Sequence, residues 1–160
     1  MLNDPALSAL RLIFGDRASV AAPVLAEHAQ SESLVTAGLP DAVVFPRSTE
    51  EVAALARWSA EHRVPLIGWG AGTSLEGHAL SLSAGVIVDF REMAAVLELR
   101  PEDRLVRVQP GITREALNQE LRSTGLMFSV DPGANASIGG MAATRASGTT
   151  AVRYGTMRDN

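Results

Sequence analysis

Apolar residues along this chain show two kinds of spacing, one typical of helices and the other of short buried strands. A helical spacing begins at Asp4-Pro5, which can cap and start a helix, and ends at Gly15. A shorter helix is expected around residues 21–27, followed by a loop. The pattern becomes much sharper at Pro40, so we expect the regular part of the fold to begin there.

Short apolar runs after Pro40 predict three strands, at residues 42–45, 64–69 and 85–90. The last run is apolar enough to be buried on both faces of a sheet. Between the first two strands, Ser48 and Glu51 have the spacing of a capping box, in which a serine caps the helix and a glutamate follows at its third position. This predicts a helix that runs to about His62.

The next region reads as a hairpin followed by a helix. Residues 96–99 and 105–109 are apolar runs separated by the turn-rich Arg100-Pro101-Glu102-Asp103. Thr113 is placed to cap a helix that Gly125 would end. Hairpin strands beside crossover helices predict an α+β (mixed α/β) fold with mixed sheets, not one uniform parallel sheet.

The amino-acid composition excludes several classes of catalytic and binding site. The chain of 160 residues is 46% hydrophobic and 20% charged, which is ordinary for a globular protein, and its net charge of −4 argues against a nucleic-acid surface. All 14 basic residues are arginine, so neither a P-loop lysine nor a Schiff-base lysine is present. The absence of cysteine excludes disulfides, iron–sulfur ligation and thiol nucleophiles. The three histidines lack metal-ligand spacing, so we expect no metal site.

The beginning of the chain does not read as a targeting or membrane segment. Asp4 stands where a secretory signal carries positive charge, and Arg11, Asp16 and Arg17 interrupt the apolar stretch that follows. We therefore expect no transmembrane segment and a cytoplasmic location.

A first glycine segment, residues 68–78, follows the second predicted strand. Glycine lets the backbone approach a ligand closely, and the hydroxyls of Thr73 and Ser74 beside backbone N–H groups suit a pyrophosphate. Gly68, Gly70 and Gly72 alternate and no amphipathic helix follows, so this is not a Rossmann fingerprint. The alternative is a flexible turn between two strands.

A second glycine segment occupies residues 131–141. Ser137 can cap a short helix whose first turn contains Gly139-Gly140, and exposed N–H groups there would favour an anionic ligand. The small residues at 142–148 could form a wall against a planar ring. The alternative is close helix packing, which also selects glycine and alanine.

Taken together, these segments resemble a known family, the FAD-linked oxidases of the vanillyl-alcohol oxidase (PCMH-type) superfamily, and within it the D-lactate dehydrogenase and glycolate oxidase flavin-subunit branch. The resemblance rests on six motifs in order, at residues 40–48, 70–77, 108–111, 131–134, 137–143 and 152–160. It implies an FAD-binding domain at residues 40–160, after an N-terminal helical segment at residues 1–39. The implied fold is two small α+β lobes with FAD between them.

The resemblance also implies roles for individual residues. The pyrophosphate would be wrapped by Trp69, Gly70, Ala71, Gly72, Thr73, Ser74 and Leu75. The pyrophosphate and flavin would be contacted by Pro132, Gly133, Ser137, Gly139 and Gly140. The isoalloxazine ring and ribityl chain would be lined by Thr144, Ser147, Gly148 and Tyr154. Complete relatives continue into a substrate domain that supplies the catalytic histidine and acidic residues, so we expect a truncated FAD-binding domain with no catalytic base.

The function implied is the FAD-binding part of an oxidoreductase that oxidises a D-2-hydroxy acid of the D-lactate or glycolate type by hydride transfer to flavin, with the electron acceptor left open. Two alternatives remain: a non-catalytic nucleotide-binding module, and a same-fold NADPH-dependent enol-ether reductase, against which the motif at residues 154–160 argues. Trp58 is interpreted as packing, and His78 as a polar neighbour of the cofactor loop. Trp69 is either a support of that loop or simply a core residue.

Overall fold

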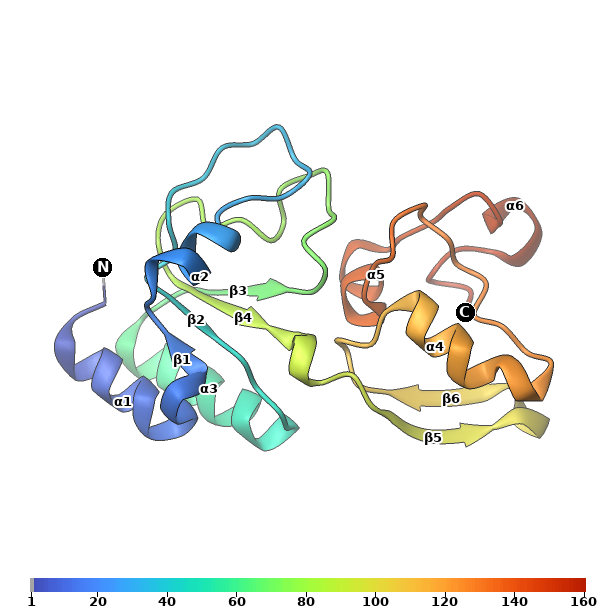
Figure 1. Ribbon diagram of the computed structural model, residues 1–160, viewed down its shortest axis with the longest axis horizontal. Helices are drawn as coiled ribbons and strands as arrows, with labels where there is room; N and C mark the ends of the chain where they lie inside the picture. The colour runs from blue at the N-terminus through green and yellow to red at the C-terminus, as the bar shows by residue number, and fades with distance from the viewer. Residues whose placement is uncertain (1) are drawn as a thin grey trace. The chain divides into compact units, whose positions relative to one another are not determined.

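The computed structural model describes residues 2–160. The chain folds into two compact units, Met1–Glu92 and Met93–Asn160, each with its own sheet and core (Figure 1). The α1 helix and the β1 strand of the N-terminal segment fold together with the strands that follow Pro40. The predicted division of the chain at Pro40 stays a prediction.

The first unit contains a four-stranded sheet in the order β1 (Ala18–Ser19), β2 (Ala42–Val44), β4 (Val86–Asp89) and β3 (Leu66–Trp69). The β2, β4 and β3 strands are parallel, and β1 pairs antiparallel with β2. Every residue of β4 is buried, as its apolar run predicted, and every residue of β2 is buried as well. The mixed sheet is thus confirmed. Its parallel strands end at one edge, where Trp69 of β3 is paired with Asp89 of β4.

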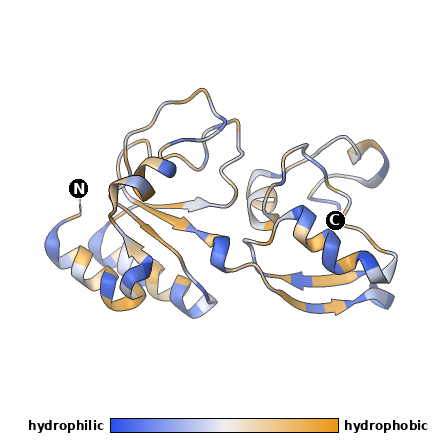
Figure 2. Ribbon diagram, viewed as in Figure 1, coloured by the Kyte–Doolittle hydropathy of each residue, from blue (hydrophilic) through white to orange (hydrophobic). Residues whose placement is uncertain are grey.

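Helices cover both faces of this sheet (Figure 1). On one face, α1 (Asp4–Phe14) and α3 (Thr49–His62) bury Leu10, Phe14, Leu55 and Trp58 against the strands. On the other face, α2 (Ala22–Glu27) packs partly buried apolar side chains against a cluster that contains Trp69. Short 3₁₀ turns follow α1 at Gly15–Arg17 and β4 at Phe90–Glu92. The β2 strand and most of β4, at the centre of this sheet, are hydrophobic (Figure 2).

The helix caps of this unit follow the sequence with two differences. The Ser48 Oγ atom accepts the Glu51 N–H at the start of α3, as predicted. The Glu51 carboxylate, however, accepts hydrogen bonds from Arg17 and from the Arg47 N–H. At α1 the N-cap is Asn3 and not Asp4: the Asn3 Oδ1 atom accepts the Ala6 N–H at 2.9 Å, and Asp4 is already in the first turn.

Trp58 has the packing role expected of it. Its side chain is 4% exposed, and its Nε1–H donates to the Ala6 carbonyl at 3.1 Å, so that the ring ties α3 to α1. His62 is the last residue of α3, and its ring lies 5.4 Å from that of Trp58.

The second unit is built on a hairpin. The β5 (Val96–Arg100) and β6 (Leu105–Val108) strands pair antiparallel across a 3₁₀ turn at Pro101–Asp103, as the two apolar runs predicted. The α4 helix (Arg114–Leu121) packs on the hairpin through Leu117 and Leu121. Thr113 caps it, and Gly125 ends the 3₁₀ turn that extends it, at Arg122–Thr124. The short helices α5 (Ile138–Thr144) and α6 (Ala151–Tyr154) follow.

An apolar cavity of about 850 Å³ opens within the second unit. It lies among β6, α4 and the stretch from Gly125 to Ser129, and Tyr154 and Met157 also line it. The first unit has a smaller cavity of about 270 Å³ beside His62 and Asp41. Among residues 2–160, no helix has the length and apolar character needed to cross a bilayer.

Candidate functional site

The first glycine segment leaves the sheet at the carboxyl end of β3 and continues to β4 without a helix. That absence, seen over residues 70–85, all of which are described, agrees with the exclusion of a Rossmann motif. Gly72 has φ +70°, a backbone conformation that glycine adopts without strain. In open sheets with parallel strands, ligands bind just beyond the carboxyl ends of the strands, which is where this segment lies.

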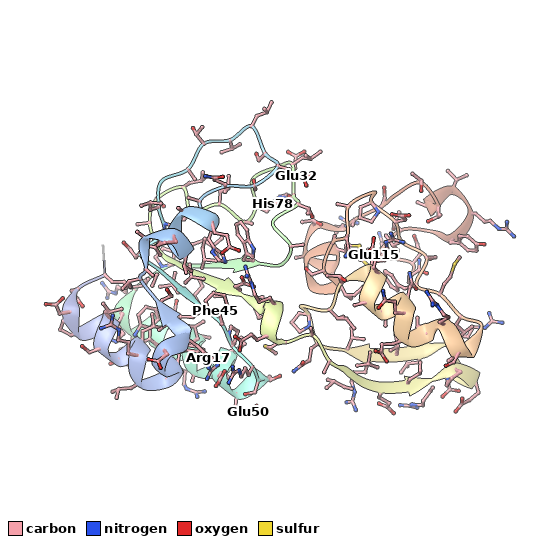
Figure 3. The ribbon with its side chains drawn as sticks, in the orientation of Figure 1. Arg17, Glu32, Phe45, Glu50, His78 and Glu115 are labelled. Atoms are coloured by element: carbon pink, nitrogen blue, oxygen red, sulfur yellow. The ribbon has the colours of Figure 1, made fainter. Side chains whose placement is uncertain are left out.

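The part of this segment that follows β3 has backbone N–H groups with no acceptor in the described part of the first unit. Within the first unit, all of which is described except Met1, no acceptor receives the N–H groups of residues 71–76. The Ser74 Oγ atom lies 2.8 Å from His78 Nδ1, so His78 is the polar neighbour that was expected (Figure 3). Unused N–H groups with a hydroxyl among them form a donor set that suits a diphosphate.

Trp69 supports this segment from below and is also a core residue. Its side chain is 6% exposed and belongs to the cluster with Val43, Ala79 and Ile87. The six-membered part of its ring lies directly beneath Gly72: a Cβ atom placed on Gly72 would be 2.6 Å from Trp69 Cζ2. The two interpretations of Trp69 are therefore compatible. Glycine is required at position 72 because the Cβ atom of any other residue would clash with the Trp69 ring.

Sequence reasoning missed an ionic network next to Trp69, in which His28 and Asp89 are buried and Arg91 and Glu27 are exposed. His28 is fully buried, with Nδ1 at 2.8 Å from the Val24 carbonyl and Nε2 at 2.9 Å from Asp89 Oδ2. Asp89 also accepts hydrogen bonds from the N–H and Nε of Arg91, which in turn binds Glu27 at 2.8 Å. The one signal for this network was an aspartate at the end of a strand predicted to be wholly buried, because a buried carboxylate requires a partner.

Both ring nitrogens of His28 face acceptors, so the geometry favours the doubly protonated, cationic ring. Burial acts to lower the pKa of His28, but hydrogen bonds to Asp89 and to the Val24 carbonyl, with the charges of Asp89 and Glu27, outweigh it and raise the pKa above its usual value. The positive ring lies 4.7 Å from the Trp69 ring, centroid to centroid.

The second glycine segment is organised differently. Ser137 caps α5 as predicted, with its Oγ atom accepting the Gly140 N–H at 3.3 Å. The expectation that the N–H groups of this turn are exposed to an anion is wrong. The Ile138 N–H donates to the Ile112 carbonyl and the Gly139 N–H to the Pro110 carbonyl, each at 2.8 Å. These donors are occupied because the turn packs on the preceding loop.

Close packing also accounts for two glycines at or near this segment. A Cβ atom on Gly139 would lie 2.5 Å from Pro110 Cβ, and one on Gly148 would overlap the Asp131 carbonyl oxygen. Gly133 differs, because its φ is +92° and a Cβ atom there would meet nothing within 4 Å. The packing alternative thus explains Gly139 and Gly148 without a ligand.

Other predicted site residues in the second unit are open to solvent. Pro132, Gly133, Thr144, Ser147 and Tyr154 are all exposed. The Thr144 hydroxyl donates to the Gly140 carbonyl at 2.9 Å, and the Arg153 guanidinium lies 5.2 Å from the centre of the Tyr154 ring. Apolar and small groups that remain accessible can lie against a planar ring. That the two glycine segments converge on one diphosphate stays a prediction.

The donor set favours an organic anion over a metal ion. In the described part of the chain, residues 2–160, no three His, Asp or Glu side chains come together as metal ligands. The first glycine segment offers N–H and hydroxyl donors, which are the groups that bind phosphate oxygens. The residues present therefore fit the diphosphate of a dinucleotide such as FAD.

Comparison with known proteins agrees with this chemistry. The family model described as FAD binding domain matches residues 40–160. The probable mitochondrial D-lactate dehydrogenase of Danio rerio is 52% identical over 96% of this chain and 31% of its own length. The mitochondrial D-lactate dehydrogenase [cytochrome] of Arabidopsis thaliana is 52% identical over 76% of this chain and 22% of its own length. The chain thus spans about a third or less of these relatives.

A solved structure shows the same arrangement of elements. Alkyldihydroxyacetonephosphate synthase superposes with a TM-score of 0.90 and 25% identity, over 99% of this chain and 32% of that protein. This likeness agrees with the predicted mixed α/β architecture. Because the family model covers most of the sequence, the chain belongs to the FAD binding domain family.

Proposed function

We propose that this chain is the FAD-binding part of an oxidoreductase that oxidises a D-2-hydroxy acid of the D-lactate or glycolate type. The observation that carries the proposal is the set of unused N–H groups at residues 71–76, beyond the carboxyl end of β3. The family match and two relatives named as D-lactate dehydrogenases support the cofactor and the substrate class.

Residues 69–75 would hold the diphosphate through N–H and hydroxyl donors, with Trp69 fixing the position of Gly72. In the second unit the flavin and its ribityl chain would lie on exposed groups, namely Pro132, Gly133, Thr144, Ser147 and Tyr154. Ser137, Gly139, Gly140 and Gly148 would contribute through shape, because the N–H groups at the start of α5 are already bonded. Bound FAD supplies the hydride acceptor of the reaction. We assign no catalytic residue within this chain.

The test is a titration of the purified chain with FAD, followed by calorimetry and by the flavin absorbance of the dialysed protein. Thr73→Glu places a negative charge within the first glycine segment, and we expect it to weaken FAD binding at least about tenfold, since like charges repel. Leu12→Glu is the matched control, because Leu12 is 88% exposed on α1, and it should bind FAD as the wild type does. A chain that ignores FAD would contradict the proposal.

A second readout separates binding from turnover. D-lactate-dependent dye reduction by the FAD-loaded chain would place catalytic groups within these 160 residues, whereas a yellow, inactive chain agrees with a cofactor-binding part. The electron acceptor is part of the same proposal: a quinone, a cytochrome or a partner flavoprotein. A cytoplasmic location also stays a proposal, since both relatives are named as mitochondrial, and cell fractionation would decide it.

A further inference from the structure

The His28 side chain is buried beneath the first glycine segment, although it comes from a distant part of the sequence. His28 follows α2 and lies outside the region that the family model matches, residues 40–160. Its 0% exposure and its two ring hydrogen bonds fix the ring between α2 and β4. A polar ring held this firmly in a core requires a reason beyond filling space, because an apolar side chain would fill the same volume at lower desolvation cost.

Contacts run from His28 to the glycine segment without a break. Asp89 at the end of β4 holds His28, and the His28 ring lies 4.7 Å from the Trp69 ring. Trp69 in turn lies against Gly72, close enough that a Cβ atom on Gly72 would meet Cζ2, Cη2 and Cε2 of the ring at 2.6–3.2 Å. We call Asp89, His28, Trp69 and Gly72 the Trp69 stack.

The charges around the stack balance. His28 and Arg91 are the positive groups, and Asp89 and Glu27 the negative ones, and contacts join them in the order His28, Asp89, Arg91 and Glu27. The ring of Phe45, the residue that follows β2, lies 6.1 Å from the His28 ring and 5.5 Å from the Arg91 guanidinium. Because every polar group in the set has a partner, the network can hold one orientation of His28, and therefore one position of the Trp69 ring.

We propose that His28 is a positioning residue for the cofactor loop: through the Trp69 stack it fixes the backbone at Gly72 and so presents the unused N–H groups of residues 71–76 in one arrangement. This inference rests on the proposed function, in which those groups bind the FAD diphosphate. A donor set that is already fixed binds without the cost of ordering a glycine-rich loop.

The variant that tests this is His28→Leu, which keeps a side chain of similar volume and removes both ring hydrogen bonds. We expect the Trp69 indole and Gly72 amide resonances of the ligand-free chain to shift, and affinity for FAD to fall about tenfold. His28→Gln retains a donor that reaches Asp89, so it should restore most of the affinity. His62→Leu is the matched control, since His62 also lies beside a tryptophan of this unit, and it should change neither readout.

The proposal is overturned if His28→Leu folds and keeps wild-type resonances for Trp69 and Gly72 together with wild-type affinity. If His28→Leu does not fold, Trp69→Phe takes its place: the smaller ring should shift the Gly72 amide, and an unmoved Gly72 resonance would overturn the proposal. A wild-type chain that binds no FAD contradicts the proposed function alone, because the resonances still report on whether His28 positions the loop.

Discussion

The two glycine segments are similar in composition but use their backbone in opposite ways. In the first, the N–H groups of residues 71–76 find no acceptor in their own unit, and Gly72 rests on a tryptophan side chain. In the second, the N–H groups of Ile138, Gly139 and Gly140 are all bonded within the protein. Glycine-rich sequence therefore identifies places of close approach, but not whether the approaching group is a ligand or the protein itself.

The largest expected effect comes from adding an atom to the close backbone contact between Gly148 and Asp131, near the second segment. Gly148→Ala would place a Cβ atom on the Asp131 carbonyl oxygen, and backbone cannot move aside as a flexible side chain can. We expect a loss of about 3 kcal/mol or more in the free energy of unfolding, measured by urea denaturation. Gly133→Ala is the control: it has open space and only its positive φ, so it should lose about 1 kcal/mol. Equal losses would contradict the packing explanation.

A smaller effect is expected at Gly139, where two terms oppose each other. An added Cβ atom would crowd Pro110, at 2.5 Å from its Cβ atom, which costs about 2 kcal/mol in a tightly packed site. Alanine is also the better helix former, which returns up to about 1 kcal/mol. We therefore expect Gly139→Ala to lower the free energy of unfolding by roughly 1–2 kcal/mol in the same assay. A stabilised variant would show that Pro110 moves aside freely.

Sequence reasoning succeeded where the signal is local. Ser48, Thr113 and Ser137 cap their helices because a hydroxyl needs only the N–H three residues on, and that spacing is visible in sequence. The strands and the hairpin were visible for the same reason, since apolar runs and turn residues are neighbours in the chain. Asn3 took the capping role expected of Asp4, a shift of one residue that propensity alone does not resolve.

What sequence reasoning missed depends on partners far apart in the chain. His28 and Asp89 are 61 residues apart, and no sequence pattern near either residue predicts that they pair. The occupied N–H groups of α5 depend on how the loop at Pro110 folds back, which is a tertiary contact. Identifying the first segment as a candidate site therefore required only local patterns, whereas understanding its support required the fold.

Replacing the serine in each segment should affect stability differently, by up to about 1 kcal/mol in the free energy of unfolding. Ser137→Ala removes the N-cap of α5 and should lower the free energy of unfolding by about 1 kcal/mol. Ser74 bonds only the exposed His78, so Ser74→Ala should change stability by less than about 0.5 kcal/mol while weakening FAD binding severalfold. Urea denaturation and calorimetry give the two numbers for each variant. A loss of stability in Ser74→Ala as large as that in Ser137→Ala would mean that hydrogen bonds within the first segment also stabilise the fold.

The smallest expected effect is a pH dependence confined to the first segment. Its support contains a titrating group, His28, whose pKa is raised in the folded protein, mainly by its hydrogen bond to Asp89, against the opposing effect of burial. A raised pKa of a cation means that its stabilisation is fully present below about pH 6.5 and is lost as the pH rises through the folded value. Gly139 and Gly148 pack against backbone and proline, which do not titrate.

We therefore expect the Gly72 amide resonance to move with the His28 ring resonances as the pH is raised from about 6.5 upward, while the Gly139 amide resonance does not move. The free energy of unfolding should fall modestly over the same range, and His28→Gln should remove that part of the fall, because glutamine does not titrate. Heteronuclear NMR across the titration, with denaturation at each pH, measures both. If Gly72 and Gly139 shifted together, the pH response would belong to the whole protein, and the two segments would not differ in the way their supports indicate.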